Sequence, residues 1–292
     1  MSQTEISAFD ARPRIKVGLI GAEIQASKSP ALHEREAAFH GFDYSHELID
    51  LAVHNCGAEA LPLILREVED KGFAGVNITF PVKQAVIEHL TDLSPEARSL
   101  GAVNTVVLRD GKRMGHNTDW YGFHESFRLN FSDVPRRCAL LLGAGGAGSA
   151  VAHAALTLGV ETLLVHDVER ARADALAARL NTEFGAGRAV VASDIPKAMF
   201  MADGLIHATP TGMAKHPGLP LDGDLLLPRH WIADIVYMPL VTPLLARARE
   251  VGCRVLDGGG MVVYQAVGAL RLFAGIEADP ARMRSHFTTL IG

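Results

Sequence analysis

The chain has 292 residues, which is long for one hydrophobic core and favours two domains. The hydrophobic content of 48% suffices for burial, and the net charge of −5 argues against nucleic acid as a general partner. The sequence has no apolar run near the ~20 residues of a membrane span, no signal-peptide core and no metal-like cysteine spacing. We therefore expect a cytoplasmic protein with no metal centre and no membrane partner.

Strand-like and helix-like segments alternate along the chain, which predicts an α/β fold with largely parallel sheets. In the first half, strands are expected at 15–20, 44–49, 74–78 and 103–108, with helices at 30–40, 58–71 and 82–90. In the second half, strands are expected at 138–142, 162–166, 188–191, 203–207, 231–236 and 253–256, with helices between most of them. A helix at 120–129 would connect the halves, and helices at 264–274 and 280–291 would close the chain.

A glycine-rich turn at 143–148 follows the strand at 138–142 and precedes a helical stretch at 149–158. A strand, a glycine turn and a helix start together present backbone N–H groups and the positive end of a helix dipole, which suits a pyrophosphate. Such turns also occur as plain connections between a strand and a helix. However, the next strand ends in His166-Asp167, where an acid that reads the ribose is expected. We therefore predict a dinucleotide site that includes Gly143, Ala144, Gly145, Gly146, Ala147 and Gly148.

Ser27 and Ser29 stand before Pro30 at the predicted start of a helix. Two hydroxyls one residue apart before a proline suit a helix N-cap, and the same hydroxyls could hold a carboxylate at the helix N-terminus. On these residues alone, capping is the favoured interpretation.

The segment 77–83, Asn-Ile-Thr-Phe-Pro-Val-Lys, ends the third strand. Pro81 suits the first turn of the next predicted helix, so Lys83 would lie in that turn. A cation there opposes the helix dipole, so the pKa of Lys83 should fall unless an acid offsets the effect. A lowered pKa would suit proton transfer at neutral pH, whereas the alternative is a solvated surface lysine.

Two further polar clusters precede the connecting helix. Asn104 lies in a β-rich run and could be either a hydrogen-bonded residue at a strand end or a ligand for a hydroxyl. Thr118 or Asp119 could cap the helix that starts at Trp120. Asp119 could instead face Lys83 and a substrate hydroxyl.

In their order along the chain, these segments resemble the shikimate dehydrogenase family, and most closely its NAD-dependent quinate/shikimate branch. The resemblance runs over nearly the whole chain from Val17. Its motifs are Ser-Lys-Ser-Pro (27–30), Asn-Ile-Thr-Phe-Pro-Val-Lys (77–83), Gly-Ala-Val-Asn-Thr (101–105), Gly-His-Asn-Thr-Asp (115–119), the glycine turn, Ala-Thr-Pro-Thr-Gly-Met (208–213), Asp-Ile-Val-Tyr-Met-Pro (234–239) and Asp-Gly-Gly-Gly-Met-Val-Val-Tyr-Gln-Ala (257–266).

The resemblance implies a substrate domain of residues 1–120 plus 265–292, a Rossmann-type domain of residues 121–264, and a cleft between them. It implies reversible oxidation of the ring 3-hydroxyl of shikimate or quinate, with Lys83 and Asp119 as the catalytic pair. Ser27 and Ser29 would bind the substrate carboxylate. The ring hydroxyls would be bound by Asn77, Thr79, Asn104, Asp119 and Gln265, with Tyr237 nearby. The dinucleotide would also contact Asp167, Thr209, Pro210, Val236, Gly258 and Met261.

The residues after the second nucleotide-domain strand depart from the pattern of NADP-dependent members, which usually carry Asn-Arg-Thr there. Here the segment 167–169 is Asp-Val-Glu, so the arginine that would meet a 2′-phosphate is absent. Asp167 can accept hydrogen bonds from a ribose diol and repels a phosphate. We therefore predict NAD over NADP, although Arg170 and Arg172 could soften that preference.

Other departures leave the substrate open. Glu23 and Ala26 replace the proline and histidine common in biosynthetic members, and Trp120 stands where a small residue is more usual. Trp120 could pack the domain junction, or the chain could act on an altered ring. Two alternatives remain, an NADP-dependent biosynthetic shikimate dehydrogenase and a non-catalytic ligand sensor, although a sensor has no use for Lys83 with Asp119. Either a monomer or a homodimer fits the sequence.

Overall fold

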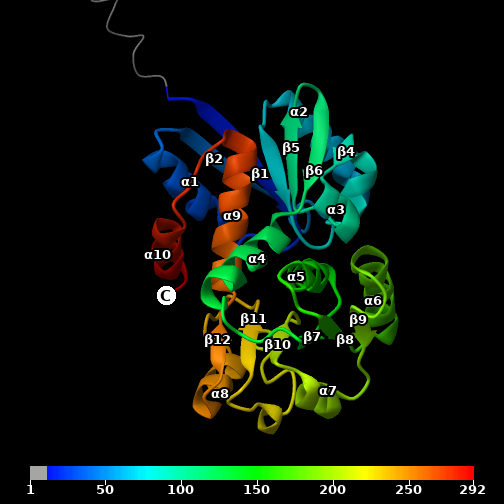
Figure 1. Cartoon of the computed structure of the whole chain (residues 1–292). Coiled ribbons are helices and arrows are strands. Elements are labelled where there is room, and N and C mark those ends of the chain that lie inside the picture. The colour runs from blue at the N-terminus through cyan, green and yellow to red at the C-terminus, as the bar shows by residue number, and fades with distance from the viewer. Residues whose placement is uncertain (1–11) are drawn as a thin grey trace, which may run out of the picture.

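The computed structural model describes residues 12–292 and contains two six-stranded sheets, one from each half of the chain. In Figure 1 the first sheet lies in the upper half and the second in the lower half, with helices α4 (Thr118–Asn130) and α9 (Gly259–Ala274) between them. The expected α/β architecture is therefore confirmed. Residues 1–11 of the expected substrate domain lie outside the described part of the chain.

The first sheet has the strand order β2-β1-β3-β5-β6-β4 and mixes parallel with antiparallel pairs. Its strands are β1 (Arg14–Gly21), β2 (Asp43–Asp50), β3 (Gly75–Ile78), β4 (Asp92–Leu93), β5 (Thr105–Arg109) and β6 (Lys112–His116). Three of its five strand pairs are parallel, as predicted, whereas β5 runs antiparallel to β3 and forms an antiparallel hairpin with β6 that was not predicted. Its turn residues, Asp110 and Gly111, both have positive φ, which is the backbone conformation that an Asp-Gly hairpin turn adopts.

The helices of the first half are α1 (Ser29–Phe39), α2 (Leu61–Asp70) and α3 (Pro95–Leu100), with a 3₁₀ turn η1 (Ala58–Ala60) before α2. The helix predicted at 82–90 is wrong, because the chain forms only the 3₁₀ turn η2 (Ala85–His89). The Lys83 carbonyl accepts from Val103 N at 2.8 Å instead of from the next helical turn. Lys83 therefore precedes the turn, and the helix dipole assumed for it is absent.

The second sheet has the order β12-β11-β10-β7-β8-β9, and all its pairs are parallel. Counted within this half, that is the order 6-5-4-1-2-3 of a dinucleotide-binding Rossmann fold. Its strands are β7 (Cys138–Leu142), β8 (Thr162–His166), β9 (Ala189–Val191), β10 (Gly204–His207), β11 (Trp231–Asp234) and β12 (Arg254–Leu256). The strand order reverses between β7 and β10, where ligands bind in such folds.

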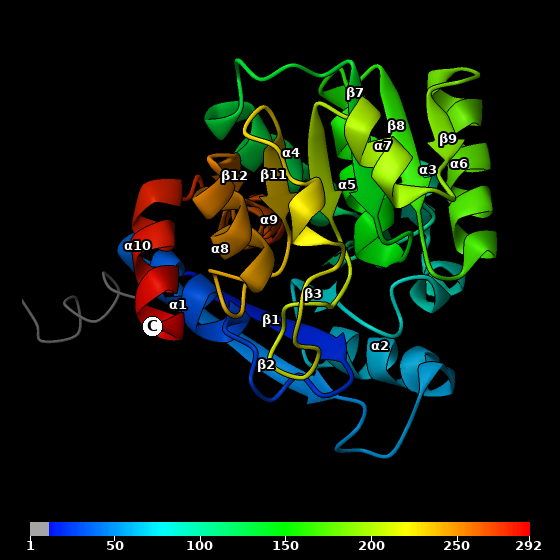
Figure 2. The same cartoon turned by 90° about the horizontal axis from the view of Figure 1, so that it is seen from below.

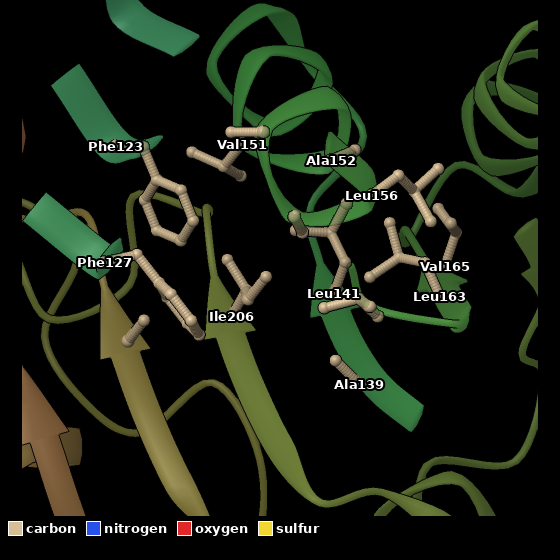
Figure 3. Packing of buried hydrophobic residues seen from close by; sticks show 14 of the residues in the cluster. Phe123, Phe127, Ala139, Leu141, Val151, Ala152, Leu156, Leu163, Val165 and Ile206 are labelled. Atoms are coloured by element: carbon tan, nitrogen blue, oxygen red, sulfur yellow. The ribbon is translucent and has the colours of Figure 1, made fainter. Parts of the chain in front are cut away.

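Helices cover both faces of this sheet because neighbouring residues of its strands point to opposite sides. Leu141 faces the side of α5 (Gly146–Thr157) and α6 (Arg170–Phe184), where Phe123 and Phe127 of α4 also pack (Figure 3). Leu140 faces the side of α7 (Ile195–Met201) and α8 (Pro243–Val251). A 3₁₀ turn, η3 (Gly223–Leu225), precedes β11. The last helix, α10 (Pro280–Ile291), lies beside α1 (Figure 2).

Helix α9 joins the two cores. It starts at Gly259, five residues before the predicted 264, and remains one helix to Ala274. Met261 packs in the core of the second sheet, whereas Phe273 packs in the core of the first. The expected domain boundary between 264 and 265 thus falls inside a continuous helix. No helix within residues 12–292 combines the length and apolar character needed to span a bilayer.

The crossing of α4 and α9 depends on a small residue. A Cβ added at Gly122 would lie 2.4 Å from the Met261 carbonyl oxygen, so the two backbones can approach this closely only at glycine. Helix α4 was predicted at 120–129, and the structure extends it by two residues at its N-terminus and one at its C-terminus. This crossing fixes the N-terminal turn of α4 relative to both sheets.

Candidate active site

The loop that leads to Ser27 is held by a buried carboxylate at the end of β2. Asp50 Oδ1 accepts from Glu23 N at 3.0 Å, and Asp50 Oδ2 accepts from Ile24 N and Gln25 Nε2, each at 3.0 Å. The Gln25 amide and these backbone donors hold the pKa of the Asp50 carboxyl below its usual range. The sequence analysis missed Asp50, although an acid directly after a predicted strand was an available signal.

Ser27 and Ser29 lie where this loop enters α1. The N-cap residue of α1 is Lys28 and no side chain caps it, so the capping interpretation of the serine pair is wrong in that form. Ser27 Oγ instead accepts from Ser29 N at 3.3 Å. Both hydroxyls thus border the first turn of an eleven-residue helix, where backbone N–H groups favour an anion.

Asn77 lies near the end of β3, and Thr79 is the first residue after this strand. Asn77 Nδ2 donates to Thr105 Oγ1 at 3.1 Å, while Asn77 Oδ1 is buried and has no hydrogen-bond partner. A buried acceptor without a partner is costly, so a ligand hydroxyl that donates to it would stabilise the site. Thr79 lies against Gly21, where an added Cβ would come within 2.2 Å of Thr79 Cγ2.

Lys83 and Asp119 form an ion pair at this edge of the sheet. Lys83 Nζ lies 2.6 Å from Asp119 Oδ2, and the side chains are 22% and 14% exposed. The N-cap of α4 is Asn117, which accepts from Asp119 N at 3.0 Å and from Trp120 N at 3.4 Å. The prediction that Thr118 or Asp119 caps the helix is therefore wrong, and the Asp119 carboxylate remains available for Lys83.

Asn104 is bound mainly to its own neighbours. Its Oδ1 accepts from Thr118 N at 2.6 Å and from Thr105 Oγ1 at 3.0 Å, and its Nδ2 donates to Thr118 Oγ1 at 3.0 Å. The structure thus favours the hydrogen-bonded strand-end interpretation for most of this side chain. The second Nδ2 proton is the one group that Asn104 has to offer a ligand.

Tyr237 and Gln265 come from the second half of the sequence. Desolvation raises the pKa of the Tyr237 hydroxyl, and the charges of Lys83 and Asp119 act on it in opposite directions, so it lies close to that pair. Gln265 lies on α9 against Gly122, which is one turn along α4 from Asp119. The structure therefore brings both residues towards the lysine–aspartate pair.

The glycine turn has the geometry that a pyrophosphate needs. A Cβ at Gly148 would lie 2.0 Å from the Gly143 carbonyl oxygen, so this glycine lets the helix pack tightly on the turn. Positions 145 and 146 instead face open space, with nothing within 4 Å of an added Cβ. No side chain caps α5 at Gly145, which leaves its first backbone N–H groups for a ligand.

Asp167 stands at the end of β8 beside the turn. Its Oδ2 accepts from Ala144 N at 2.7 Å and its Oδ1 accepts from Glu169 N at 2.8 Å. Arg172 pairs with Glu169 at 2.8 Å, and Arg170 lies 3.5 Å from Asp174. Both arginines thus already have carboxylate partners.

Of the other predicted cofactor residues, Thr209, Pro210, Val236 and Gly258 lie on loops that follow β10, β11 and β12, and Met261 lies in the first turn of α9. A Cβ at Gly143 would lie 3.1 Å from Thr209 Cγ2, and one at Gly258 would lie 2.6 Å from the Val236 carbonyl oxygen. Pro210 is exposed beside them, whereas the Met261 side chain is mostly buried in the core. The loop after β10 also reaches the first domain, because Lys215 Nζ lies 3.2 Å from Glu23 Oε2.

Trp120 lies at the domain junction. Its ring centroid is 5.5 Å from that of His153 on α5, in an edge-on arrangement. It also packs against the core beneath the second sheet, which favours the packing interpretation of this residue. Among residues 12–292, no three His, Cys, Asp or Glu side chains are grouped to hold a metal ion.

A parallel sheet with a glycine turn at its switch point binds a dinucleotide, and a mostly buried lysine–carboxylate pair supports proton transfer. Dinucleotide-linked dehydrogenases are the class of protein that combines these features. Residues 19–106 match the model of the shikimate dehydrogenase substrate binding domain.

Similar proteins extend the match to almost the whole chain. The shikimate dehydrogenase (NADP(+)) of Streptomyces avermitilis is 54% identical, covering 94% of this chain and 96% of that protein. The quinate/shikimate dehydrogenase (NAD(+)) of Corynebacterium efficiens is 44% identical, covering 94% and 98%. The structure of quinate dehydrogenase from Corynebacterium glutamicum in complex with NAD has a TM-score of 0.90 at 41% identity, covering 95% and 100%. The chain belongs to the shikimate dehydrogenase family.

Proposed function

We propose that the chain catalyses the reversible NAD-linked oxidation of the ring 3-hydroxyl of shikimate, with quinate as a second substrate. The observation that carries the proposal is the pair of Lys83 and Asp119, 2.6 Å apart and mostly buried. The names of the relatives from Streptomyces avermitilis and Corynebacterium efficiens support the substrate class.

The two charged residues divide the proton chemistry between them. Oxidation of an alcohol to a ketone removes a hydride and a proton, and the dinucleotide, when bound, accepts the hydride. In its amine form Lys83 Nζ accepts the hydroxyl proton and becomes an ammonium group, which Asp119 holds in place. Because both side chains are mostly buried, their electrostatic interaction is stronger than it would be on the surface.

The polar groups of the first domain fit a hydroxylated ring acid. Ser27 and Ser29, at the start of α1, are proposed to bind the carboxylate. Asn77 Oδ1, which is buried without a partner, is proposed to accept from a ring hydroxyl. Thr79, Asn104 and Gln265 are proposed to complete the hydroxyl contacts.

We infer a preference for NAD from the carboxylates after β8. A 2′-phosphate in that place would meet Asp167, which already accepts from Ala144 N, and a second acid at Glu169. Arg170 and Arg172 are paired with acids and would have to break those pairs to bind the phosphate. The NAD complex of the Corynebacterium glutamicum enzyme supports this preference.

The NADP-linked reaction is the second candidate, because the Streptomyces avermitilis relative carries an NADP(+) name. Initial rates with shikimate and quinate, each with NAD and NADP, separate the two. The proposal expects a higher kcat/KM with NAD for both substrates. A higher kcat/KM with NADP would overturn the NAD preference, whereas dinucleotide binding without turnover of either substrate would indicate a ligand sensor.

The variant Asp167→Ser tests the residue itself. Removing the carboxylate eliminates its repulsion of a 2′-phosphate, so the ratio of kcat/KM for NAD over NADP should fall by about tenfold. Asp224→Ser, which removes an exposed carboxylate of the same domain that pairs with Arg247, is the matched control and should leave the ratio unchanged.

A further inference from the structure

A histidine with no exposed side-chain surface ends β10. His207 Nδ1 lies 2.9 Å from Oδ1 of Asp234, which ends the neighbouring strand β11 and is equally buried. Both residues stand at the carboxyl ends of parallel strands, at the sheet edge where a dinucleotide binds. Neither residue is among the predicted site residues, although Asp234 begins the motif at 234–239, and the proposed reaction does not use them.

Asp234 is bound on all sides by donors. Besides the histidine, its Oδ1 accepts from Val236 N at 2.9 Å and its Oδ2 accepts from Thr242 Oγ1 at 2.7 Å. An ionised carboxylate can only accept, so the hydrogen-bond network assigns the ring proton of His207 to Nδ1. In the neutral ring, Nε2 is then an acceptor.

Nε2 of His207 faces the hydroxyl of Thr209, in the loop that follows β10. His207 Nε2 lies 2.5 Å from Thr209 Oγ1, and that oxygen accepts from Thr211 N at 3.3 Å. Thr211 Oγ1 is the other acceptor near this hydroxyl, at 3.2 Å, so the shorter 2.5 Å contact places the hydroxyl proton towards the histidine. The expected contact of Thr209 with the cofactor would thus come from its methyl group or backbone.

The same loop rests on the glycine turn. Ala208 N donates to the Leu142 carbonyl at 2.8 Å, and an added Cβ at Gly143 would lie 2.6 Å from the Ala208 carbonyl oxygen. A displacement of the Thr209 loop would therefore also displace Gly143, the first residue of the glycine turn. Asp234 and His207 together connect this loop to Val236, another predicted cofactor contact.

We propose that Asp234 and His207 are positioning residues that fix the Thr209 loop and Val236 at the cofactor crevice, and so set the affinity for the dinucleotide. The inference rests on the proposed function in that a dinucleotide is the ligand. It assigns His207 no contact with substrate or cofactor. Its action passes entirely through the Thr209 hydroxyl and the Val236 backbone.

Two substitutions break the connection at different points. In His207→Asn, the shorter amide can still donate to Asp234 but does not reach Thr209. In Thr209→Val, the hydroxyl is lost while the buried Asp234–His207 pair remains. Each is expected to raise the Kd for NAD by about tenfold, measured by calorimetry, because the hydrogen bond between His207 and the Thr209 hydroxyl is lost. The double variant should be no worse than either single variant.

A buried histidine elsewhere in the same domain provides the control. His230 Nδ1 accepts from Leu227 N at 3.1 Å, and its buried Nε2 has no hydrogen-bond partner, so His230 is not part of the Asp234–His207–Thr209 network. His230→Asn should lower Tm and leave the Kd for NAD unchanged. If His207 had only a structural role, His207→Asn would likewise lower Tm without changing the Kd for NAD.

The proposal is overturned if Thr209→Val leaves the Kd for NAD within about twofold of the wild-type value. That variant decides the matter even where His207→Asn does not fold. Failure of the proposed reaction is distinguishable, because wild-type protein that binds NAD without oxidising shikimate or quinate would overturn the reaction and still permit the binding test.

Discussion

Lys83 Nζ lies 2.6 Å from Asp119 Oδ2, and the two residues come from different elements, the turn after β3 and the first turn of α4. The position of Lys83 is fixed by its carbonyl, which accepts from Val103 N, and that of Asp119 by the Asn117 cap. A backbone hydrogen bond thus fixes the segment of each residue, which keeps the two side chains at the distance that proton transfer requires.

Lys83→Ala should reduce kcat by about 10²–10⁴-fold, because the proton relay is lost, while the KM values and Tm change little. Initial rates followed by nicotinamide absorbance measure the loss. Lys71→Ala removes an exposed lysine that pairs with Glu67 and is the matched control. Turnover at the wild-type rate in Lys83→Ala would contradict the assignment.

Asp119→Asn should lower kcat by roughly tenfold or more, because the amide keeps the size of the side chain but not its charge. Its effect should be smaller than that of Lys83→Ala, since Lys83 remains. The control is Asp92→Asn, which removes a carboxylate from an exposed ion pair of equal length, 2.6 Å to Arg98. Equal rates in both variants would show that the buried position of Asp119 is immaterial.

Two glycines of the same turn should respond differently to alanine. Gly148→Ala places a Cβ 2.0 Å from the Gly143 carbonyl oxygen and should lower the free energy of unfolding by about 1–3 kcal/mol. Gly145→Ala places its methyl group in open space and should leave Tm nearly unchanged, while raising the KM for NAD. Thermal unfolding and dinucleotide kinetics of both variants check this; equal Tm values would refute the packing role of Gly148.

The buried histidines of the first domain should make stability depend on pH. Burial lowers the pKa of His46 to about 4 and that of His33 well below its usual value, and their rings are 4.8 Å apart beside Tyr44. The unfolded chain therefore binds protons near pH 6.5, before the folded chain does, so stability is lost as pH falls from about 6.5 to about 4.

For His46 alone this loss amounts to about 3 kcal/mol, from a shift of some 2.5 pKa units. The variant His46→Gln cannot be protonated, so its free energy of unfolding should fall less steeply over this range. Urea unfolding at several pH values measures the two slopes, and identical slopes would show that His46 does not titrate on unfolding. His54→Gln, an exposed histidine of the same domain, is the control.

The elements that short patterns specify were predicted well. The strands of the second sheet and the glycine turn depend on apolar runs and glycines within a few positions, and the structure reproduces them within about two residues. The hairpin of β5 and β6 was missed, although Asp110-Gly111 is a local turn signal. The prediction of a helix at 82–90 was wrong because the backbone N–H of Val103, twenty residues further along the chain, donates to the Lys83 carbonyl.

The sequence by itself determined the alternation of strands and helices, the family, and which residue types are available for chemistry, because these follow from local spacing and from motifs read in order. Only the tertiary structure decided which side chains meet. Asp50 binds the serine loop from 25–27 positions away, His207 joins Asp234 across 27, and Lys83 reaches Asp119 across 36. Strand order and the crossing of α4 with α9 set those encounters, because packing fixes distances that spacing along the chain does not.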